Sequence, residues 1–301
     1  MTPRGRDGAS VAGIAITHPD KVFWPDDGYT KRDLAEYYAA VFPRLRPYVQ
    51  DRLLTLERCP DGLRGSCFYQ REAPKSLPPG TPTQRVRDKT GATTYVVGGR
   101  LQTQLALVNL GCIAVHTWPS RRRAPHKPDW LCFDIDPTSG QFADAARAAR
   151  LIKARLDDLG LSSFPKTSGS RGLHIFVPIR QGPDNAAVLA FAEAFGRILA
   201  GAHPKELTVE ARVRARRGRV YIDPFRNGFA QTVVAPFSVR RRPKAPVSTP
   251  LDWSEVDPGL DPVRFNLGNF QRRLDEPDPW KDFFRRRQSL TAALRGSRKT
   301  S

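Results

Sequence analysis

Two aspartates, Asp134 and Asp136, end an apolar run that begins at Trp130. Successive side chains of a strand point to opposite faces, so both carboxylates project to one side while Ile135 faces the core. Adjacent carboxylates repel each other unless a cation neutralises them, and Mg²⁺ and Mn²⁺ take oxygen ligands. The motif therefore indicates a divalent-metal site of the kind used in two-metal phosphoryl transfer. The alternative is a pair of solvated carboxylates at a strand-to-turn junction, since Asp-x-Asp also occurs by chance.

A third carboxylate follows a second apolar strand. Residues 219–222 precede Asp223 and then Pro224, which repeats the design of the first motif. On a neighbouring strand Asp223 would complete a metal triad, although an Asp before Pro also commonly starts a turn. Glu210 and Asp252 are rival third ligands in weaker strand contexts.

A Ser- and Gly-rich segment, residues 167–174, separates two expected strands. Its small residues let backbone N–H groups approach an anion, as a triphosphate pocket requires. Side chains in it can add hydrogen bonds or positive charge: Ser168, Ser170, Arg171 and His174. It is not a P-loop, because Gly-Lys-[Ser/Thr] is absent and no helix follows directly. An ordinary hairpin turn is the alternative.

Basic and imidazole side chains end two further strands. Arg240, Arg241 and Arg242 offer three guanidinium groups for phosphates of a nucleotide or of DNA, or else form a solvated basic edge. His116 ends another apolar run and is a minor nucleotide-binding candidate, since a lone His there is more often hydrogen-bonded scaffold.

The overall composition favours a nucleic-acid partner. The chain has 301 residues, and 49 lysines and arginines against 30 acidic residues give a net charge of +19 and a pI near 10.4. Such a surplus attracts polyanions, although the abundance of arginine also suits a coding bias. With 40% apolar residues the chain can bury a core, which excludes disorder for most of its length. No run reaches the roughly 18 apolar residues of a membrane span, and the charged N-terminus is not a signal peptide. We expect a soluble cytoplasmic protein.

The four cysteines, Cys59, Cys67, Cys112 and Cys132, are widely spaced. Without a Cys-x-x-Cys pair they predict neither a zinc site nor a disulfide framework. Cys112 and Cys132 lie in apolar runs and are expected to be buried thiols.

The hydrophobic pattern predicts a mixture of helices and strands. Thr30-x-x-Asp33 is typical of a capping box, and a helix over 31–47 follows it. Further helices are expected over 101–110, 141–160, 185–200 and 280–294. Strands are expected over 53–58, 67–71, 93–97, 112–117, 130–135, 163–167, 173–179, 219–222 and 231–239, with a long exposed loop over 73–92.

These elements do not alternate strictly, which favours an α+β fold with mixed or antiparallel sheets flanked by helices. We expect a single domain over residues 14–295 between flexible ends at 1–13 and 296–301.

The order of these motifs resembles the archaeo-eukaryotic primase superfamily, and more narrowly the polymerase domain of bacterial DNA ligase D, an end-joining primase-polymerase. The resemblance extends from about residue 16 to about residue 270. Besides the motifs above it rests on several short segments: His18-Pro-Asp-Lys21-Val22, Pro60-Asp-Gly62, Phe68-Tyr69-Gln70, Leu110-Gly-Cys112, Pro128-Asp129, Phe237-Ser-Val-Arg240 and Pro246-Val-Ser-Thr-Pro250.

The resemblance implies a role for each matching position. Two divalent ions, Mg²⁺ or Mn²⁺, would bind the catalytic triad of Asp134, Asp136 and Asp223. The nucleoside triphosphate would contact Ser168, Arg171, His174 and Arg240, with Ser170 and His116 as further nucleotide-binding candidates. A DNA 5′-phosphate would bind His18, Lys21 and Lys31, and the template would stack on Phe68 and Tyr69. Family members often carry Asn at position 18 and Phe at position 69. The loop over 73–92 matches one used to bring two DNA ends together.

The implied activity is template-directed addition of nucleotides to a DNA 3′-OH, filling gaps and extending ends in double-strand-break or gap repair, with a preference for ribonucleotides. Its DNA would be gapped, nicked or overhanging and carry a 5′-phosphate. Because the chain has no ligase lysine motif or nuclease segment, we expect a free-standing module that works with a separate DNA ligase and a Ku-type end-binding protein at the bacterial nucleoid. The alternatives are a catalytically weak module that bridges DNA ends, and a de novo primase.

Overall fold

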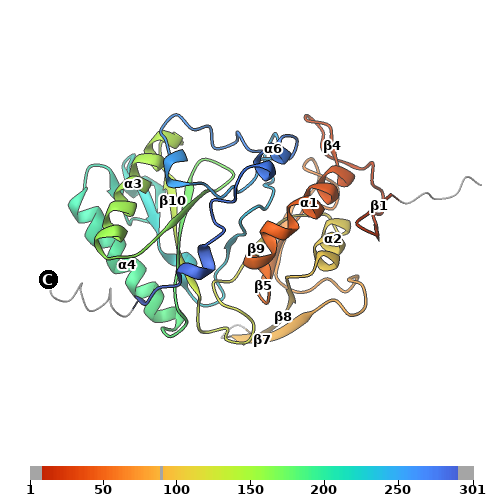
Figure 1. The fold of residues 1–301 in the computed structure, drawn as a ribbon, viewed down its shortest axis with the longest axis horizontal. Helices are drawn as coiled ribbons and strands as arrows, with labels where there is room; N and C mark the ends of the chain where they lie inside the picture. Colours follow the sequence, from red (N-terminus) through yellow and green to blue (C-terminus); the bar gives the residue numbers. More distant parts are fainter. Residues whose placement is uncertain (1–8, 89–90, 291–301) are drawn as a thin grey trace, which may run out of the picture.

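Two mixed layers of sheet and helix make up the fold in the computed structural model, which describes residues 9–88 and 91–290 (Figure 1). A five-stranded sheet has the order β11-β12-β10-β14-β13, with bounds Phe164–Thr167, Leu173–Pro178, Trp130–Pro137, Val220–Asp223 and Leu207–Thr208. Its pairs are antiparallel except β13–β14. The predicted α+β class is confirmed.

The six-stranded sheet has the order β15-β9-β5-β8-β7, and β6 pairs with β5. The bounds in that order are Val233–Val234, Cys112–Thr117, Leu53–Arg58, Gly91–Val97 and Thr83–Asp88, with β6 at Phe68–Gln70. Two small hairpins precede it: β1 (Ser10–Val11) with β2 (Ile14–Ala15), and β3 (Val22–Trp24) with β4 (Tyr29–Thr30).

Helix α1 (Lys31–Val49) starts where its capping sequence predicts. The Thr30 hydroxyl accepts a hydrogen bond from the Asp33 amide at 3.3 Å, and the Asp33 carboxylate accepts one from the Thr30 amide at 2.7 Å. Two otherwise unpaired helix-end donors are thereby satisfied. Helix α1 packs beside α2 (Leu101–Asn109), and both contact β9 of the six-stranded sheet (Figure 1).

Helices α3 (Phe142–Asp158) and α4 (Asn185–Ala202) cover the five-stranded sheet, and both contact β10. By length and composition alone, the 18 residues of α4 are apolar enough to cross a membrane, which the sequence analysis missed. Val188, Phe191, Phe195 and Leu199 of α4 are buried in the core, so one face of this helix is used for packing. The shorter helices are α5 (Val213–Arg216), α6 (Phe270–Asp275) and 3₁₀ turns at Phe225–Asn227, Trp253–Glu255 and Phe283–Arg286.

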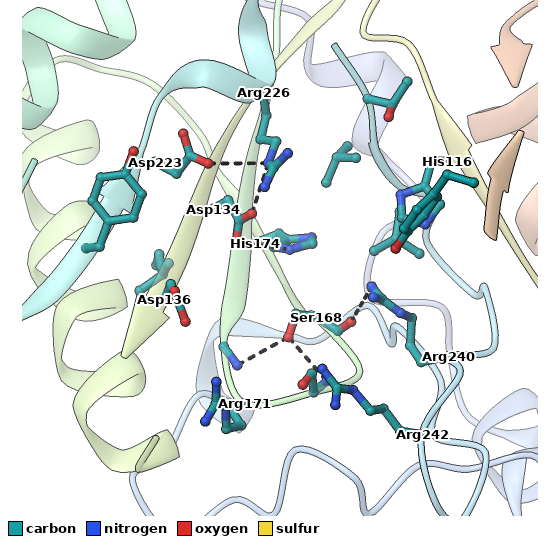
Figure 2. Close-up of a pocket in the computed structure, with 18 of the residues that line it drawn as sticks. His116, Asp134, Asp136, Ser168, Arg171, His174, Asp223, Arg226, Arg240 and Arg242 are labelled. Atoms are coloured by element: carbon teal, nitrogen blue, oxygen red, sulfur yellow. Dashed lines mark hydrogen bonds and ion pairs between the residues drawn. The ribbon is translucent and has the colours of Figure 1, made fainter. Parts of the chain in front are cut away.

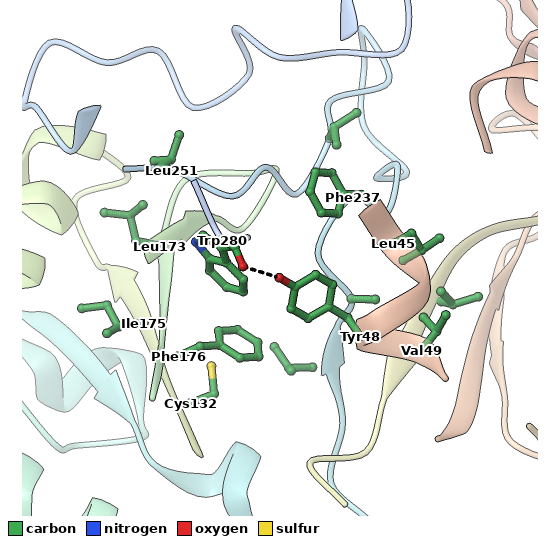
Figure 3. Packing of buried hydrophobic residues seen from close by; sticks show 14 of the residues in the cluster. Leu45, Tyr48, Val49, Cys132, Leu173, Ile175, Phe176, Phe237, Leu251 and Trp280 are labelled. Atoms are coloured by element: carbon green, nitrogen blue, oxygen red, sulfur yellow. Dashed lines mark hydrogen bonds between the residues drawn. The ribbon is translucent and has the colours of Figure 1, made fainter. Parts of the chain in front are cut away.

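An aromatic cluster joins the two layers (Figure 3). The Trp280 ring stacks on Phe283 at 5.1 Å and meets Phe176 of β12 at 5.4 Å. From the other layer, the Tyr48 hydroxyl of α1 donates a hydrogen bond to the Trp280 carbonyl at 3.3 Å. Burying one such ring stabilises the fold by roughly 1.5–3 kcal/mol. The hydrophobic core is therefore continuous between the sheets, and it fixes their relative position.

Three predictions about local structure are wrong. The expected loop over 73–92 contains β7, which pairs with β8 as an edge strand. Its polar composition hid it, because charged side chains such as Arg85 are usual on sheet edges. The expected strand over 231–239 is reduced to β15, since Pro236 has no N–H for a ladder and Phe237 has a φ of 66°.

The third is the expected helix over 280–294, which is a 3₁₀ turn at Phe283–Arg286. The turn ends because Gln288 adopts extended backbone beside β12, where its amide donates to Pro178 at 3.1 Å. Residues 291–294, the expected flexible C-terminus 296–301 and residues 1–8 of the expected flexible N-terminus 1–13 lie outside the described residues. Within the rest of that N-terminal segment, Ser10–Val11 forms β1 and pairs with β2. The domain boundaries stay a prediction.

The cysteine prediction also needs correction, because Cys59 and Cys67 form a disulfide. In the β5–β6 pair Arg58 lies opposite Phe68, so the next positions along the two strands also face each other. Cys112 and Cys132 are buried free thiols, as predicted.

Candidate active site

A cavity of about 510 Å³ opens where β10, β14 and the loop between β11 and β12 meet segments of the other layer (Figure 2). Carboxylates from the strands face arginines from the loops across it. Nine of the residues predicted to bind metal or nucleotide line it: Asp134, Asp136, Asp223, Ser168, Ser170, Arg171, His174, Arg240 and His116.

The carboxylates come together through strand register. Asp134 of β10 is the direct antiparallel partner of Asp223 of β14, and Asp136 is the partner of Tyr221. Opposite residues of such a pair have β-carbons about 4.5–5.5 Å apart. The Asp134 and Asp223 side chains are 21% and 12% exposed, so they meet at the cavity wall with limited access to water.

Two arginines that the sequence analysis missed neutralise these acids. Arg226 Nε lies 3.1 Å from Asp134 Oδ2 and 3.4 Å from Asp223 Oδ2, and so bridges the pair. Arg216 Nη1 lies 2.8 Å from Asp136 Oδ2. The only sequence signal for Arg226 was its place three residues after Asp223, in the turn that follows β14.

The pKa values of Asp134 and Asp223 are shifted in opposite directions, although both carboxylates contact Arg226. Burial opposes ionisation of Asp134, but His174 and Arg226 outweigh it and hold the pKa of Asp134 well below its usual range. Burial raises the pKa of Asp223, and the negative charge of Asp134 adds to the effect against the opposing charge of Arg226. Ionising the Asp223 carboxyl therefore costs more free energy than ionising that of Asp134.

Among residues 9–88 and 91–290, no three His, Cys, Asp or Glu side chains are grouped closely enough to form a metal site in this conformation. The donor set nevertheless fits a hard divalent cation, because three carboxylates from two paired strands face one cavity. Arg226 and Arg216 supply the compensating charge in the structure, and ligation of a cation requires them to release these oxygens.

His174 of β12 lies on the other side of β10, directly opposite Asp134. Its Nε2 is 3.3 Å from Asp134 Oδ1. Its Nδ1 is 2.8 Å from Nζ of Lys166, a buried lysine that the sequence analysis did not single out. Burial, followed by the charge of Lys166, lowers the pKa of His174 to about 4, so the ring is neutral near pH 7.

The Ser- and Gly-rich segment forms a tight turn, which was one of the two interpretations drawn from the sequence, and its binding of a triphosphate stays a prediction. The Ser168 hydroxyl accepts hydrogen bonds from the amides of Ser170 and Gly172, both at 3.2 Å, and so closes a tight turn. Gly172 is required there, because a β-carbon would collide with the Ile135 carbonyl of β10. The turn leaves the Arg171 side chain exposed at the cavity.

The three consecutive arginines divide between two tasks. Arg240 and Arg242 line the cavity, and Arg240 Nη1 donates to the Ser168 carbonyl at 3.2 Å. Arg241 Nε instead lies 2.8 Å from Oε1 of Glu57, a buried acid on β5. Arg241, the middle one of the three arginines predicted to bind phosphate, is therefore engaged in an ion pair outside the cavity.

An exposed aromatic pair borders the cavity on β6. Phe68 and Tyr69 are 42% and 55% exposed. The Tyr69 ring meets the His116 ring edge-on at 5.3 Å, while Arg58 lies over Phe68 at 5.5 Å. Exposed rings beside a polar cavity are suited to stacking on bases.

The model of the LigD primase-polymerase domain matches residues 30–280. The chain belongs to this family. The chain is 32% identical over 295 residues to the multifunctional non-homologous end joining protein LigD of Pseudomonas aeruginosa, covering 97% of this chain and 35% of the relative. It is 28% identical to the bifunctional non-homologous end joining protein LigD of Bacillus subtilis, covering 96% of this chain and 47% of the relative. The chain thus spans less than half the length of these curated relatives.

A solved structure has the same fold. The polymerase domain from Mycobacterium tuberculosis ligase D in complex with DNA superposes with a TM-score of 0.84 at 28% identity, covering 90% of this chain and 98% of that one.

The predicted 5′-phosphate residues lie outside the cavity, around β3 and β4. Lys21 Nζ pairs with Asp61 at 2.8 Å. Lys31 is buried, and its Nζ donates to the carbonyls of Thr17 at 2.8 Å and Asn109 at 3.2 Å. Burial and then the charge of Lys21 lower the pKa of Lys31. His18 has a φ of 50°, a left-handed conformation in which Asn and His are enriched.

The rival third ligands have other partners. Asp252 caps the turn Trp253–Glu255, accepting hydrogen bonds from the Ser254 amide at 2.8 Å and hydroxyl at 2.7 Å. Glu210 is exposed and is not among the residues that line the cavity. Asp223 is therefore the third acid that the fold brings to Asp134 and Asp136.

Proposed function

We propose that this chain is a template-directed nucleotidyltransferase that adds nucleotides to the 3′-OH of DNA at gaps and broken ends. The observation that carries the proposal is the strand register of Asp134 and Asp223, which delivers both acids and Asp136 to a cavity lined by Arg171, Arg240 and Arg242. Membership of the LigD primase-polymerase family and the likeness to a polymerase domain in complex with DNA support it.

Each wall of the cavity has a task in this proposal. Asp134, Asp136 and Asp223 would hold divalent cations, Mg²⁺ or Mn²⁺, which when bound stabilise charge on the reacting phosphate and favour ionisation of the 3′-OH. On the opposite wall Arg171 and Arg240 offset the charge of the leaving pyrophosphate. His174 and Ser170 add hydrogen-bond donors for the triphosphate, and His116 lies beside Tyr69 on the side where a base would stack.

The substrates and partners follow from the charge and from the family. A net charge of +19 favours a polyanion such as DNA. We propose that ribonucleotides are preferred, that the protein acts near the nucleoid in the cytoplasm, and that a DNA ligase and a Ku-type protein complete the repair of broken ends.

The test is primer extension with the purified chain, a recessed primer-template, Mg²⁺ or Mn²⁺, and labelled ribo- or deoxyribonucleotides. We expect extension that is lost when Asp134→Ala and Asp136→Ala are combined and kept in Asp252→Ala, which removes an acid outside the cavity. Extension by the double variant at the wild-type rate would refute the assignment. Tight DNA binding without extension would favour the end-bridging alternative, and equal synthesis without a primer would favour the primase.

We further propose that His18, Lys21 and Lys31 form the 5′-phosphate site. Lys21 is the more accessible lysine, because its Nζ pairs with one exposed carboxylate, whereas Lys31 is buried and held by two backbone carbonyls. Lys21→Ala is expected to reduce the preference for a phosphorylated over an unphosphorylated gap. The Lys205→Ala variant, at a cation remote from β3 and β4, is the matched control. An unchanged preference in Lys21→Ala contradicts this site.

A further inference from the structure

Lys166 is a buried lysine directly behind the candidate active site. It lies on β11 with no exposed surface, and its Nζ is 5.7 Å from the centre of the Phe176 ring. An amine in such surroundings is costly unless its hydrogen bonds are satisfied. Methionine would fill similar space without that cost, so the polar group calls for an explanation.

The contacts of Lys166 Nζ define which atoms donate. Nζ contacts the Ser248 hydroxyl, and that hydroxyl donates to the Thr167 carbonyl at 2.9 Å. The Ser248 oxygen is therefore an acceptor toward Nζ. The second contact of Nζ is Nδ1 of His174 at 2.8 Å.

The far side of the His174 ring settles the direction of this second bond. Nε2 lies 3.3 Å from Asp134 Oδ1, and an ionised carboxylate can only accept hydrogen bonds. Nε2 therefore carries the proton. In a neutral imidazole Nδ1 is then the acceptor, and Lys166 must donate to it.

We propose that Lys166 is a positioning residue, which holds His174 in one ring orientation with Nδ1 buried and Nε2–H directed into the cavity. In the structure this N–H faces Asp134 Oδ1 on the cavity wall. That it is released to donate to a phosphate oxygen of the nucleoside triphosphate rests on the proposed function. The ring geometry does not, since the contacts of the ring with Lys166 and Asp134 are made without any ligand. Lys166 touches no ligand itself and acts only through the imidazole.

The first test reads the ring directly, in protein without nucleotide or DNA. In ¹⁵N-histidine-labelled protein, the His174 resonances are assigned by their loss in His174→Ala. We expect a proton on Nε2 and a hydrogen-bonded, unprotonated Nδ1. Lys166→Met should remove the hydrogen-bonded signature of Nδ1, whereas Ser248→Ala, which removes the other partner of the same amine, should keep it. A wild-type spectrum with the proton on Nδ1 overturns the inference, even if Lys166→Met fails to fold.

The second test asks whether Lys166 acts through His174. Binding of ATP with Mg²⁺ is measured by calorimetry. Lys166→Met should weaken it about tenfold, which corresponds to one hydrogen bond to a charged group. In the His174→Ala background the same change should alter affinity less than about twofold, because the positioned group is already gone. An undiminished loss in that background, or full affinity in Lys166→Met, contradicts the proposal. If the ring geometry is found but the chain binds no ATP and extends no primer, the proposed function fails and the positioning role stands.

Discussion

Asp134 and Asp223 are direct cross-strand partners in the antiparallel pair of β10 and β14. Like charges placed opposite each other in a sheet destabilise it. Here Arg226 bridges both carboxylates, so the fold tolerates an arrangement that a purely structural sheet would avoid. The two acids therefore face each other at the position where we propose that a divalent cation binds.

The first prediction concerns Asp223. Asp223→Asn keeps the shape of the side chain and its hydrogen bond from the Phe225 amide. It removes a carboxyl group whose pKa is raised by burial and by the charge of Asp134. We expect nucleotide incorporation to fall about a hundredfold or more, since a metal ligand contributes several kcal/mol to the transition state. The unfolding temperature of the metal-free protein should rise, because the buried like charge is gone. Primer extension measures nucleotide incorporation, and calorimetry measures the unfolding temperature. Unchanged incorporation would exclude Asp223 from the triad.

The second prediction concerns Arg226, which supplies positive charge where a cation would. Arg226→Met leaves Asp134 and Asp223 facing each other without the guanidinium that bridges them. Because Arg226 is 40% exposed, we expect a loss of only about 1 kcal/mol in the free energy of unfolding without metal. Adding Mn²⁺ should then raise the unfolding temperature more in the variant than in the wild type. Arg285→Met, which removes a well-exposed partner of Asp282, is the control and should show no such difference.

The sequence predicted most of what local pattern determines. The capping box of Thr30 and Asp33 marked the start of α1, and alternation along β10 placed Asp134 and Asp136 on one face. The position of Asp223 was also predicted, because an apolar strand that ends in Asp is visible without knowledge of its neighbours.

Features that depend on strand pairing escaped prediction. Arg216 and Lys166 acquire their partners through strand and loop packing, and nothing in their own segments marks them. Arg226 has one local signal, its place three residues after Asp223, but its contact with Asp134 depends on strand pairing. The disulfide between Cys59 and Cys67 was missed for the same reason, since it follows from the register of β5 and β6 rather than from a Cys-x-x-Cys spacing.

The third prediction is a pH dependence of stability that originates at Glu57. Burial would raise the pKa of Glu57, but His116, Arg240 and Arg241 outweigh burial and lower it from 4.5 to about 2. A carboxyl with a depressed folded pKa stabilises the protein above its unfolded pKa, and this contribution is lost as the pH falls from about 4.5 toward 2. It amounts to about 3 kcal/mol at neutral pH.

Glu57→Gln should therefore unfold more easily than the wild type at pH 7, and the difference should shrink at pH 3. Urea unfolding at both pH values measures it. Glu193→Gln, on the outer face of α4, is the control with little expected effect at either pH. A deficit in Glu57→Gln that stays constant with pH would mean that its charge is not the stabilising feature.

The fourth prediction separates stacking from charge at the template side. Tyr69 is more than half exposed, and its ring is held edge-on against His116, so it offers a preoriented face to a base. Stacking of one base on an aromatic ring contributes roughly 1–3 kcal/mol. Tyr69→Ala should therefore weaken binding of a single-stranded template roughly five- to hundredfold, while Tyr69→Phe keeps the ring and the affinity.

Fluorescence anisotropy over a range of salt concentrations gives a second criterion. The slope of log affinity against log salt should be the same in Tyr69→Ala as in the wild type, because no phosphate contact is lost, whereas Arg242→Ala should reduce it. A reduced slope in Tyr69→Ala would mean that the tyrosine acts by orienting cations rather than by stacking on bases.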